Sequence, residues 1–382
     1  MEDNLLMQIK EFIRSKIYNN DDFRVQWAKS NPFVGTENEY SYQGKTDFTL
    51  GIIYDPAHYH RYFMAACQDL RISYKIVDIL KDSWIEEIEK SNCEGFMVWP
   101  HLNSFVLKEI IDERIFLINK YLKIPVYPNL EAISILDNKR RVRDWLLANK
   151  FTPPKTWCFT EKKEALEFID KTTYPIVFKT VKGSVSHGVS IILNKAKAKK
   201  LVHQCFGKGV YPFRMDRRNV QWDFILFQEY LEDCDEKRVI RIGSNYFIID
   251  KVRGNSKYHS GSGYMKWGEQ DDYFLNKTKE ITDKGGFTCM NVDFLVDKKG
   301  NAYVNELHAL FHGPKIEDRS NIGMYLLDEL SNKWIKREGN HYRNYTTNYR
   351  VLDFVNQIGL SYTDNENWLE KDVFYEINGI KM

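Results

Sequence analysis

Apolar and polar positions alternate in two different ways along this chain. In the first third, short apolar strands are separated by amphipathic helical segments. Strands are predicted at 48–54, 74–79, 95–99 and 125–127, and helices at 4–17, 58–70, 83–90 and 105–122. This β/α order is typical of a small parallel sheet covered by helices, so residues 47–130 are expected to form an α/β domain.

The second pattern consists of strands separated by short turns, which favours an antiparallel sheet. A helix is predicted from Asp137, as its N-cap, to Asn149. The other predicted elements are strands at 176–180, 190–193, 224–230, 239–242 and 246–252 and helices at 161–170, 195–206, 276–285 and 347–358. We expect four units: an N-terminal helical arm (1–46), the α/β domain (47–130), a domain at 131–335 split near 228–232, and a C-terminal extension (336–382).

Residues 291–308 are predicted to form a β-hairpin with its turn at 297–300. This turn would set Asp293 opposite Val304, so that Val304, Glu306 and His308 share the face of Asp293. Carboxylates at a diagonal cross-strand distance of roughly 7–8 Å can bridge a hard cation. A surface hairpin with solvated acids is the alternative, but Asp293 lies in an otherwise apolar strand, which favours the metal site.

Composition narrows the class of protein. The 382 residues are 43% hydrophobic, and no apolar run reaches 18 residues, so no membrane span is predicted. The first residues, MEDNLLMQIK, lack a basic region followed by an apolar run, so no signal peptide is predicted. None of the six cysteines falls in a CxxC pair, which suits reduced thiols in a cytoplasmic protein better than disulfides or zinc. With a net charge of +2 and no basic stripe interleaved with aromatics, nucleic acid is not an expected partner.

Two lysines are candidates for binding an anion. Lys179 ends an apolar strand, where burial is costly without an anionic partner, and it precedes a loop that can offer N–H and hydroxyl groups to phosphate. The loop residues concerned are Gly183, Ser184, Ser186, His187 and Gly188. An ordinary turn is the alternative for this loop. Lys139, at the predicted helix start, would by itself be a solvated lysine.

A second group of candidates surrounds the 228–232 split. Gln228, Glu229, Tyr230 and Leu231 close an apolar strand and lead into acidic residues that include Glu232 and Asp235. These residues form either a strand end with a solvated turn or a linker whose backbone meets an adenine edge. Arg238 and Arg253 are suited to bind phosphate or carboxylate, with surface ion pairs as the alternative. Arg241 has the opposite parity to Arg238, so both cannot face one site.

Taken in order, these pieces resemble the ATP-grasp superfamily, most closely its carboxylate–amine ligases such as glutathione synthetases and ribosomal-protein glutamate ligases. The resemblance covers roughly residues 47–330. It rests on the ordered series DNK (137–139), VFK with its glycine loop (177–188), QEYL (228–231), RVIRIG (238–243), Arg253 and VDFLVD…YVNE (292–306). It implies an α/β (α+β) chain with an ATP-grasp fold preceded by a small parallel-sheet domain.

The resemblance also implies roles. Lys139, Lys179 and the 183–188 loop would contact ATP phosphates, residues 228–231 would form the adenine hinge, and Glu232 or Asp235 would lie near ribose. Asp293 and Glu306 would hold Mg²⁺, while Arg253 and Arg238 would neutralise the transferred phosphoryl group. One position departs from the family, because His308 stands where Asn usually binds the second magnesium. Three outcomes are open there: a site weakened or shifted towards Mn²⁺, a role towards substrate, or a structural role.

The implied activity is ADP-forming ligation of a carboxylate to an amine. An ATP-grasp kinase acting on a hydroxyl and a degenerate nucleotide-binding or scaffold protein are the alternatives. An amino acid, a peptide or a sugar acid would each fit as a small-molecule substrate. The segments 1–46 and 336–382 are candidates for contacts in a homodimer.

Overall fold

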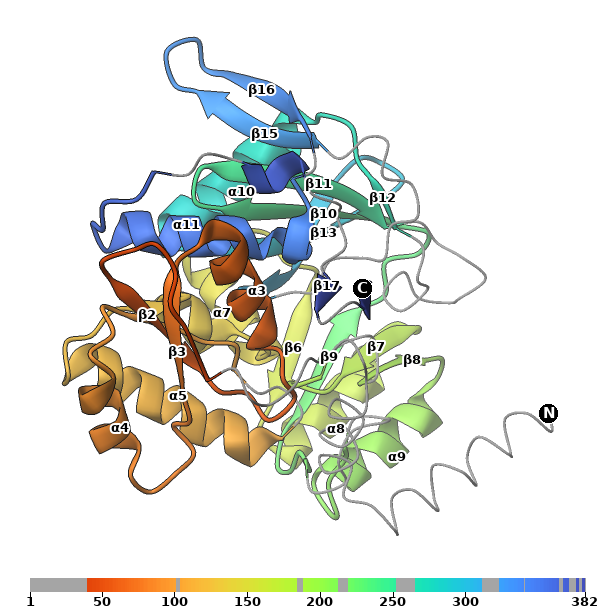
Figure 1. Ribbon diagram of the computed structural model, residues 1–382. Coiled ribbons are helices and arrows are strands. Elements are labelled where there is room, and N and C mark those ends of the chain that lie inside the picture. Colours follow the sequence, from red (N-terminus) through yellow and green to blue (C-terminus); the bar gives the residue numbers. More distant parts are fainter. Residues whose placement is uncertain are drawn as a thin grey trace.

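The chain folds into three lobes, each built on its own sheet (Figure 1). The computed structural model describes residues 40–100, 104–183, 188–211, 219–251, 265–310, 323–339, 341–363, 367–370, 376–377 and 380–381. The predicted helix at 4–17 lies outside these residues. Within them, no helix is long and apolar enough to cross a membrane.

The N-terminal lobe is the predicted parallel sheet with its helices. Its strands run in the order β1-β3-β2-β4-β5, with only β1 antiparallel to its neighbour. Apolar side chains such as Leu50, Ile52 and Met97 are fully buried. The elements are β1 (Ser41–Tyr42), β2 (Thr49–Ile53), α3 (Arg61–Leu70), β3 (Ser73–Val77), α4 (Trp84–Ser91), β4 (Phe96–Met97), α5 (Phe105–Lys120) and β5 (Val126–Tyr127).

A second lobe is a four-stranded antiparallel sheet in the order β6-β9-β7-β8. Two helices close its apolar core, in which Phe227 stacks against Phe168 with ring centroids 5.8 Å apart. The elements are β6 (Thr156–Phe159), α8 (Lys162–Lys171), β7 (Ile176–Lys179), β8 (Val189–Ile192), α9 (Lys195–Cys205) and β9 (Ile225–Glu229). The apolar pattern did not reveal β6.

The third lobe is a seven-stranded sheet in the order β14-β13-β10-β11-β15-β16, with β12 also paired to β11. One face packs on α10 through Phe274 and Phe294, whose rings are 5.0 Å apart. The other face meets α11 through Phe247 and Tyr349, 5.9 Å apart. The elements are β10 (Asp235–Ile242), β11 (Asn245–Lys251), β12 (Met265–Trp267), α10 (Asp272–Gly285), β13 (Cys289–Val296), β14 (Ala302–His308), β15 (Gly323–Asp328), β16 (Lys333–Glu338) and α11 (Thr347–Gln357).

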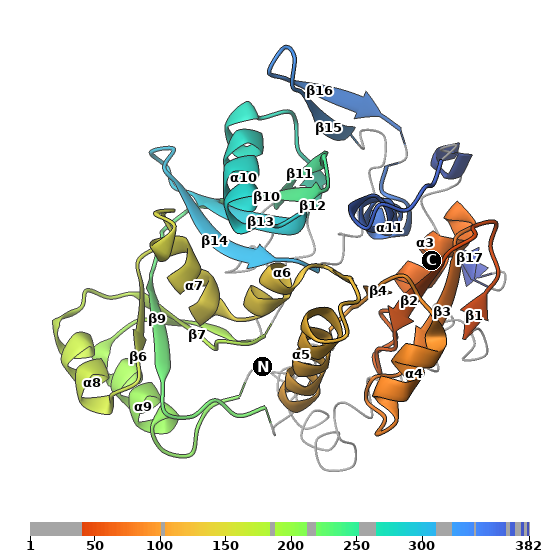
Figure 2. The same ribbon diagram turned by 90° about the vertical axis from the view of Figure 1, so that its left-hand side faces the viewer.

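Two short helices, α6 (Leu130–Ile135) and α7 (Lys139–Ala148), lie between the lobes (Figure 2). The N-cap of α7 is Asn138, whose Oδ1 accepts from the N–H of Arg141 at 3.0 Å, so the prediction of Asp137 as the cap was wrong. Asp137 instead has a left-handed backbone with φ 54°. This conformation frees its carboxylate to reach a neighbouring loop.

The C-terminal segment joins the first lobe to the third. Helix α11 packs beside α3, and its Phe354 lies 5.5 Å from Tyr127 of β5. The remaining elements are the 3₁₀ helices η2 (Arg343–Thr346) and η3 (Asn367–Glu370) and the strands β17 (Glu376–Ile377) and β18 (Ile380–Lys381). Because α11 shares one core with both sheets, the first and third lobes are tied together away from the second.

Candidate functional site

The β13–β14 hairpin has a different register from the predicted one. Asp293 pairs with Glu306, while Phe294 pairs with Val304, so Asn305 is an extra, bulged residue on β14. The prediction that Asp293 faces Val304 was wrong for two reasons. The turn is longer, since the N–H of Asp297 donates to the carbonyl of Asn301 at 3.0 Å, and the bulge adds a further shift. Val304 therefore lies on the face of Phe294, whereas Glu306 still shares the face of Asp293.

Asp293 is fully buried and ion-paired on both oxygens. Arg238 donates to its Oδ1 at 2.7 Å and to its Oδ2 at 2.8 Å, and Lys251 donates to Oδ2 at 2.6 Å. Burial alone would raise the pKa of Asp293, but the two adjacent cations hold that pKa well below its ordinary value. The carboxylate is therefore ionised and held in a fixed position.

Lys251 connects Asp293 to a second buried acid. Its amine also donates to Glu236, which lies directly opposite Lys251 across β10 and β11. Arg238 is two residues beyond Glu236 and pairs with Asp293 across β10 and β13. Two acids and two cations thus alternate on one sheet face, which compensates charges that would be costly to bury singly. Arg241 lies on the opposite face, where it donates to Thr282 of α10 at 2.7 Å, in agreement with the predicted parity.

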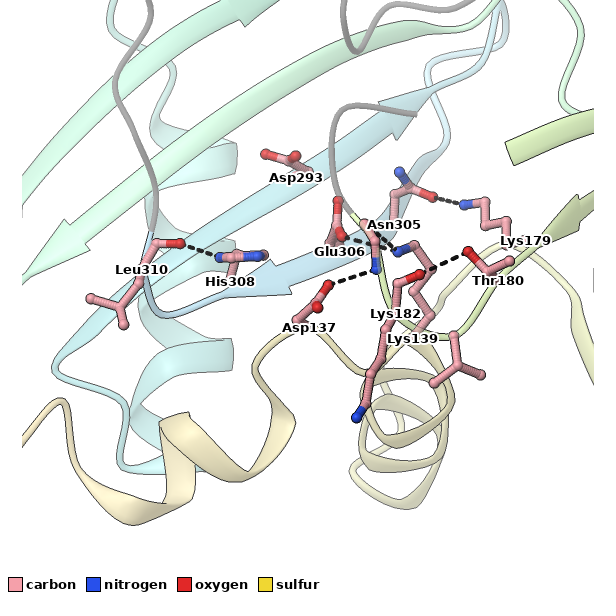
Figure 3. Close-up of polar contacts among 12 residues, drawn as sticks. Asp137, Lys139, Lys179, Thr180, Lys182, Asp293, Asn305, Glu306, His308 and Leu310 are labelled. Carbon is pink, nitrogen blue, oxygen red and sulfur yellow. Dashed lines mark hydrogen bonds and ion pairs between the residues drawn. The ribbon is translucent and has the colours of Figure 1, made fainter. Parts of the chain in front are cut away.

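Lys179 reaches this sheet from the second lobe. Its amine donates to Oδ1 of Asn305 at 3.0 Å, so the bulge on β14 provides its partner (Figure 3). Burial lowers the pKa of Lys179 to about 8, although Glu306 acts in the opposite direction. An amine with so low a pKa, held beside an amide, is suited to accept an anionic ligand.

Lys139 lies beside Glu306 and the glycine loop. Its amine donates to the carbonyl of Gly183 at 2.7 Å and lies 3.9 Å from Oε1 of Glu306. Burial raises the pKa of Glu306, but the charge of Lys139, assisted by His308 and Lys179, leaves it below its ordinary value. The carboxylate of Glu306 is therefore ionised near neutral pH, and Lys179 is mostly protonated there.

The glycine loop is tied to α7 and to β7. Asp137 accepts from the N–H of Gly183 at 3.0 Å, and the N–H of Thr180 donates to the carbonyl of Gly188 at 2.8 Å. A side chain at Gly188 would place its Cβ 1.7 Å from Oγ1 of Thr180, so glycine is required there. Ser184, Ser186, His187 and Arg253 lie outside the described residues, and their predicted roles stay predictions.

A pocket between α7, β7, β9 and β14 lies next to both lysines. Its lining includes Lys139, Lys179, Gln228 and Asn305, and its volume of about 20 Å³ is enough for about one water molecule. A nucleotide base would enter only if these elements moved apart. Gln228 donates to Oγ1 of Thr156 at 3.1 Å, and the carboxylate of Glu229 accepts from the N–H of Lys155 at 2.6 Å. These contacts brace the predicted hinge, which continues as Tyr230 and Leu231 after β9 ends.

The acids after the hinge differ in their position. Glu232 and Asp235 are exposed, whereas Glu236 is buried on the face of Arg238. The predicted ribose contact by Glu232 or Asp235 stays a prediction. Of the acids after the hinge, Glu236 is the one that belongs to the charged cluster with Lys251, Arg238 and Asp293. The sequence contains a signal for this placement: Glu236 and Arg238 are two residues apart, so they lie on the same face of β10.

His308 lies opposite Asn291 on the same face as Glu306. Its Nδ1 is hydrogen-bonded to the carbonyl of Leu310, and because a carbonyl can only accept, Nδ1 carries a proton and Nε2 is the ring nitrogen that this bond leaves unused. In the described part of the chain, no three His, Cys, Asp or Glu side chains converge as a metal site. The predicted metal roles of Asp293, Glu306 and His308 therefore stay predictions.

Sequence reasoning missed several members of this site. Asn305 was hidden because a bulge cannot be read from alternation, and Lys251 was hidden because it ends a strand that looked merely apolar. Glu236 was passed over in favour of its acidic neighbours. Asp137 was assigned to a helix cap instead of to the loop that it holds.

Sequence comparison supports the ATP-grasp resemblance for the part of the chain that contains the lysines of this cluster. Residues 136–264 match the model of the RimK-like ATP-grasp domain. This segment is thus a RimK-like ATP-grasp domain, and both the predicted superfamily and the predicted fold class are confirmed.

Individual relatives are distant. A phosphoribosylamine–glycine ligase from Fusobacterium nucleatum is 25% identical over 122 residues, which are 32% of this chain and 27% of that protein. The chain thus matches about a quarter of the length of that curated relative. D-alanyl-alanine synthetase A from Vibrio cholerae has a TM-score of 0.51 at 12% identity, over 82% of this chain and 99% of its own. The ATP-grasp ligase PsnB, solved with a minimal precursor, has a TM-score of 0.51 at 14% identity, over 72% and 95%. These structural likenesses concern the fold.

Proposed function

We propose that this chain is an ATP-dependent ligase that joins a carboxylate to an amine and releases ADP and phosphate. One observation carries the proposal. Two lysine amines from different elements reach adjacent residues of β14, beside a pocket at the junction of two sheets. Lys139 lies 3.9 Å from Glu306, and Lys179 donates to Asn305 at 3.0 Å. Such a junction suits a polyanion that is bound together with a divalent cation. The relatives' ligase activities add support for this class of reaction.

The lysines would bind the phosphates of ATP. Lys179 has a lowered pKa, and its hydrogen-bond partner among the described residues is a neutral amide, so a phosphate would stabilise its charged form. Lys139 donates a hydrogen bond to the carbonyl of Gly183 and would exchange it for a charge-assisted hydrogen bond to a phosphate oxygen. The N–H of Gly183 is already used by Asp137, so that part of the loop is positioned before any nucleotide enters.

Mg²⁺ fits beside Glu306 better than beside Asp293. The Glu306 carboxylate is ionised and 28% exposed, and among the described residues its ion pair is with Lys139 at 3.9 Å. Both oxygens of Asp293 accept hydrogen bonds from Arg238 or Lys251, so Asp293 could bind Mg²⁺ only by sharing an oxygen with one of these cations or by giving up a hydrogen bond. Magnesium would supply charge neutralisation on the phosphate oxygens.

In the proposed reaction, a carboxylate oxygen bonds to the γ-phosphorus while the bond from that phosphorus to the ADP oxygen breaks. An amine nitrogen then bonds to the acyl carbon, phosphate leaves with the electron pair, and the amine loses a proton. No nucleophilic side chain is required, because positioning and charge stabilisation provide the catalysis. Lys139 and Lys179 would orient the phosphoryl group. The substrates fall in the class of amino acids, peptides or sugar acids.

The test is to measure nucleotide products across a panel of carboxylates and amines, with Mg²⁺ and with Mn²⁺. Hydroxylamine serves as a general acceptor, since it converts an acyl-phosphate into a hydroxamate. We expect carboxylate-dependent ADP, phosphate and hydroxamate. Lys179→Met and Glu306→Gln are expected to lower the rate by at least about 100-fold. Lys199→Met, an exposed lysine on α9, is the matched control.

Other outcomes separate the alternatives. AMP and pyrophosphate would contradict the proposal. A stable phosphorylated product without an amine acceptor would indicate a kinase. ATP binding without turnover on any carboxylate, unchanged in Glu306→Gln, would indicate a binding or scaffold protein.

A further inference from the structure

Asn291 and His308 form a cross-strand pair beside the two candidate metal-binding carboxylates. They face each other on β13 and β14, two residues along from the pair of Asp293 and Glu306. Residues that are directly opposite in an antiparallel pair lie on the same face, and so do residues two apart along a strand. The four side chains therefore form a square on the site face of the sheet.

The amide of Asn291 is buried without a partner. Its side chain is 1% exposed, and neither its Oδ1 nor its Nδ2 has a hydrogen bond to any other part of the described chain. A buried polar group left unsatisfied costs roughly 1–3 kcal/mol. Such a cost is expected where a ligand supplies the missing interaction, and Asn291 directs its amide to the face of Glu306 and Asp293.

His308 presents a lone pair next to this amide. Its Nδ1 proton is committed to the carbonyl of Leu310, on the side of the imidazole away from Glu306 (Figure 3). The remaining Nε2 is therefore an acceptor or a metal ligand. A backbone carbonyl that fixes the tautomer and orients the ring is the usual support of a metal-binding histidine.

We propose that Oδ1 of Asn291 and Nε2 of His308, together with the carboxylate of Glu306, bind a cation that is Mn²⁺ in preference to Mg²⁺. This inference rests on the proposed function, since phosphate oxygens of the nucleotide complete the coordination. A set of two oxygens and one imidazole nitrogen suits Mn²⁺, whereas Mg²⁺ takes oxygen ligands almost exclusively. Asp293 is outside this set because Arg238 and Lys251 use its oxygens.

Glu306 links the two halves of the site. Lys139 lies 3.9 Å from its Oε1, and His308 follows it by two residues on the same face of β14. The carboxylate thus lies between the phosphate-binding lysines and the Asn291–His308 pair. A cation held by this pair would also contact a phosphate that is bound by Lys139.

The experiment measures Mn²⁺ binding to the full chain with a non-hydrolysable ATP analogue. Electron paramagnetic resonance counts bound Mn²⁺, and electron spin echo modulation detects nitrogen bonded to the metal. We expect a nitrogen coupling in the parent protein that is lost in His308→Asn. The same variant is expected to lower the preference for Mn²⁺ over Mg²⁺ by about tenfold, because the new ligand is an oxygen.

Asn291 is tested with two variants of nearly equal size. Asn291→Leu removes the oxygen donor and is expected to weaken Mn²⁺ binding by at least about tenfold. Asn291→Asp keeps the donor and is expected to retain Mn²⁺ binding. His203→Asn, an exposed histidine of α9, is the matched control and is expected to leave the nitrogen coupling unchanged.

Two failures can be told apart. If the analogue binds with Mn²⁺ but the parent protein shows no nitrogen coupling, the inference is overturned and the proposed function stands. If calorimetry detects no nucleotide binding with either metal, the proposed function itself fails. Equal Mn²⁺ binding by Asn291→Leu and the parent would remove Asn291 from the site.

Discussion

Asp293 and Lys251 form a buried ion pair, with Nζ of Lys251 2.6 Å from Oδ2 of the carboxylate and both side chains almost wholly inaccessible to solvent. Lys251 also contacts Glu236, and Arg238 donates to both oxygens of Asp293. The carboxylate that the sequence marked as a metal ligand is therefore also the centre of a charge cluster in the large sheet.

Replacing Asp293 by Asn is expected to destabilise the third lobe. The change removes one negative charge from between two cations and leaves Arg238 without an anionic partner of its own. Breaking a buried ion pair from one side costs about 3–5 kcal/mol. The free energy of urea unfolding measures the effect. Exposed Asp82→Ala is the control and should stay within about 0.5 kcal/mol of the parent.

The same cluster predicts sensitivity to acid. The pKa of Asp293 is lower in the folded state than in the unfolded chain, so its stabilisation is complete above the ordinary carboxyl pKa of about 4. This stabilisation is lost as the pH falls below that value. The parent should lose stability between pH 5 and pH 3 more steeply than Asp293→Asn. Parallel profiles for the two proteins would argue against the charged cluster.

The sequence was sufficient for the fold class, for the parallel sheet of the first lobe and for the ATP-grasp resemblance, because periodicity and ordered motifs are local signals. It placed Lys139, Lys179 and Glu306 on the elements that bring them together. It could not give the hairpin register, since the turn length and the bulge at Asn305 leave no trace in the alternation of apolar residues. Pairings such as Glu236 with Lys251 depend on which strands become neighbours, which is a property of the tertiary fold.

ATP binding is expected to weaken above pH 8. Burial lowers the pKa of Lys179 to about 8, and only the protonated amine attracts phosphate. Above that pH a proton must be taken up on binding, so affinity should fall by up to about tenfold per pH unit. Calorimetric titration between pH 6.5 and 9.5 measures this change. In Lys179→Arg the group stays charged, and the decline should disappear.

A substitution at Asn305 tests whether the amine of Lys179 causes the loss of ATP binding at high pH. Its Oδ1 accepts from Lys179 at 3.0 Å, so Asn305→Asp would place a negative charge at hydrogen-bond distance. An adjacent opposite charge raises the pKa of a lysine, and the decline in ATP binding should move to higher pH. Asn332→Asp, in the exposed turn after β15, is the matched control. If ATP binding by Asn305→Asp still weakened near pH 8, the decline would be due to the titration of a group other than Lys179.

A side chain at Gly188 is expected to displace the glycine loop. The new Cβ would lie 1.7 Å from Oγ1 of Thr180, which is held by its hydrogen bond to the carbonyl of Lys182 at 2.7 Å. Overpacking of this kind costs about 1–3 kcal/mol, so Gly188→Ala should weaken ATP binding roughly tenfold. Thr180→Ala in the same chain removes the clashing hydroxyl and should restore much of the affinity. Equal affinities of Gly188→Ala and the parent would show that the loop does not contact the nucleotide.

Asp69 of α3 and Arg343 of η2 are expected to fix the C-terminal segment on the first lobe. Asp69 accepts from Nη2 of Arg343 at 2.8 Å and from Nδ2 of Asn344 at 2.9 Å, and both members of the ion pair are at least nine-tenths buried. The contact also holds a left-handed turn that begins at Asn344 with φ 50°. Asp69→Ala leaves a buried guanidinium without its carboxylate and should cost about 3–5 kcal/mol in urea unfolding.

A double variant separates lost charge compensation from lost packing in this contact. Arg343→Met removes the cation and keeps an apolar side chain of similar length, so Asp69→Ala with Arg343→Met should be less destabilised than the sum of the single variants. A coupling free energy above about 1 kcal/mol is expected for residues in direct contact. Additive losses would mean that the first lobe holds α11 through apolar contacts such as Tyr127 with Phe354, rather than through the ion pair.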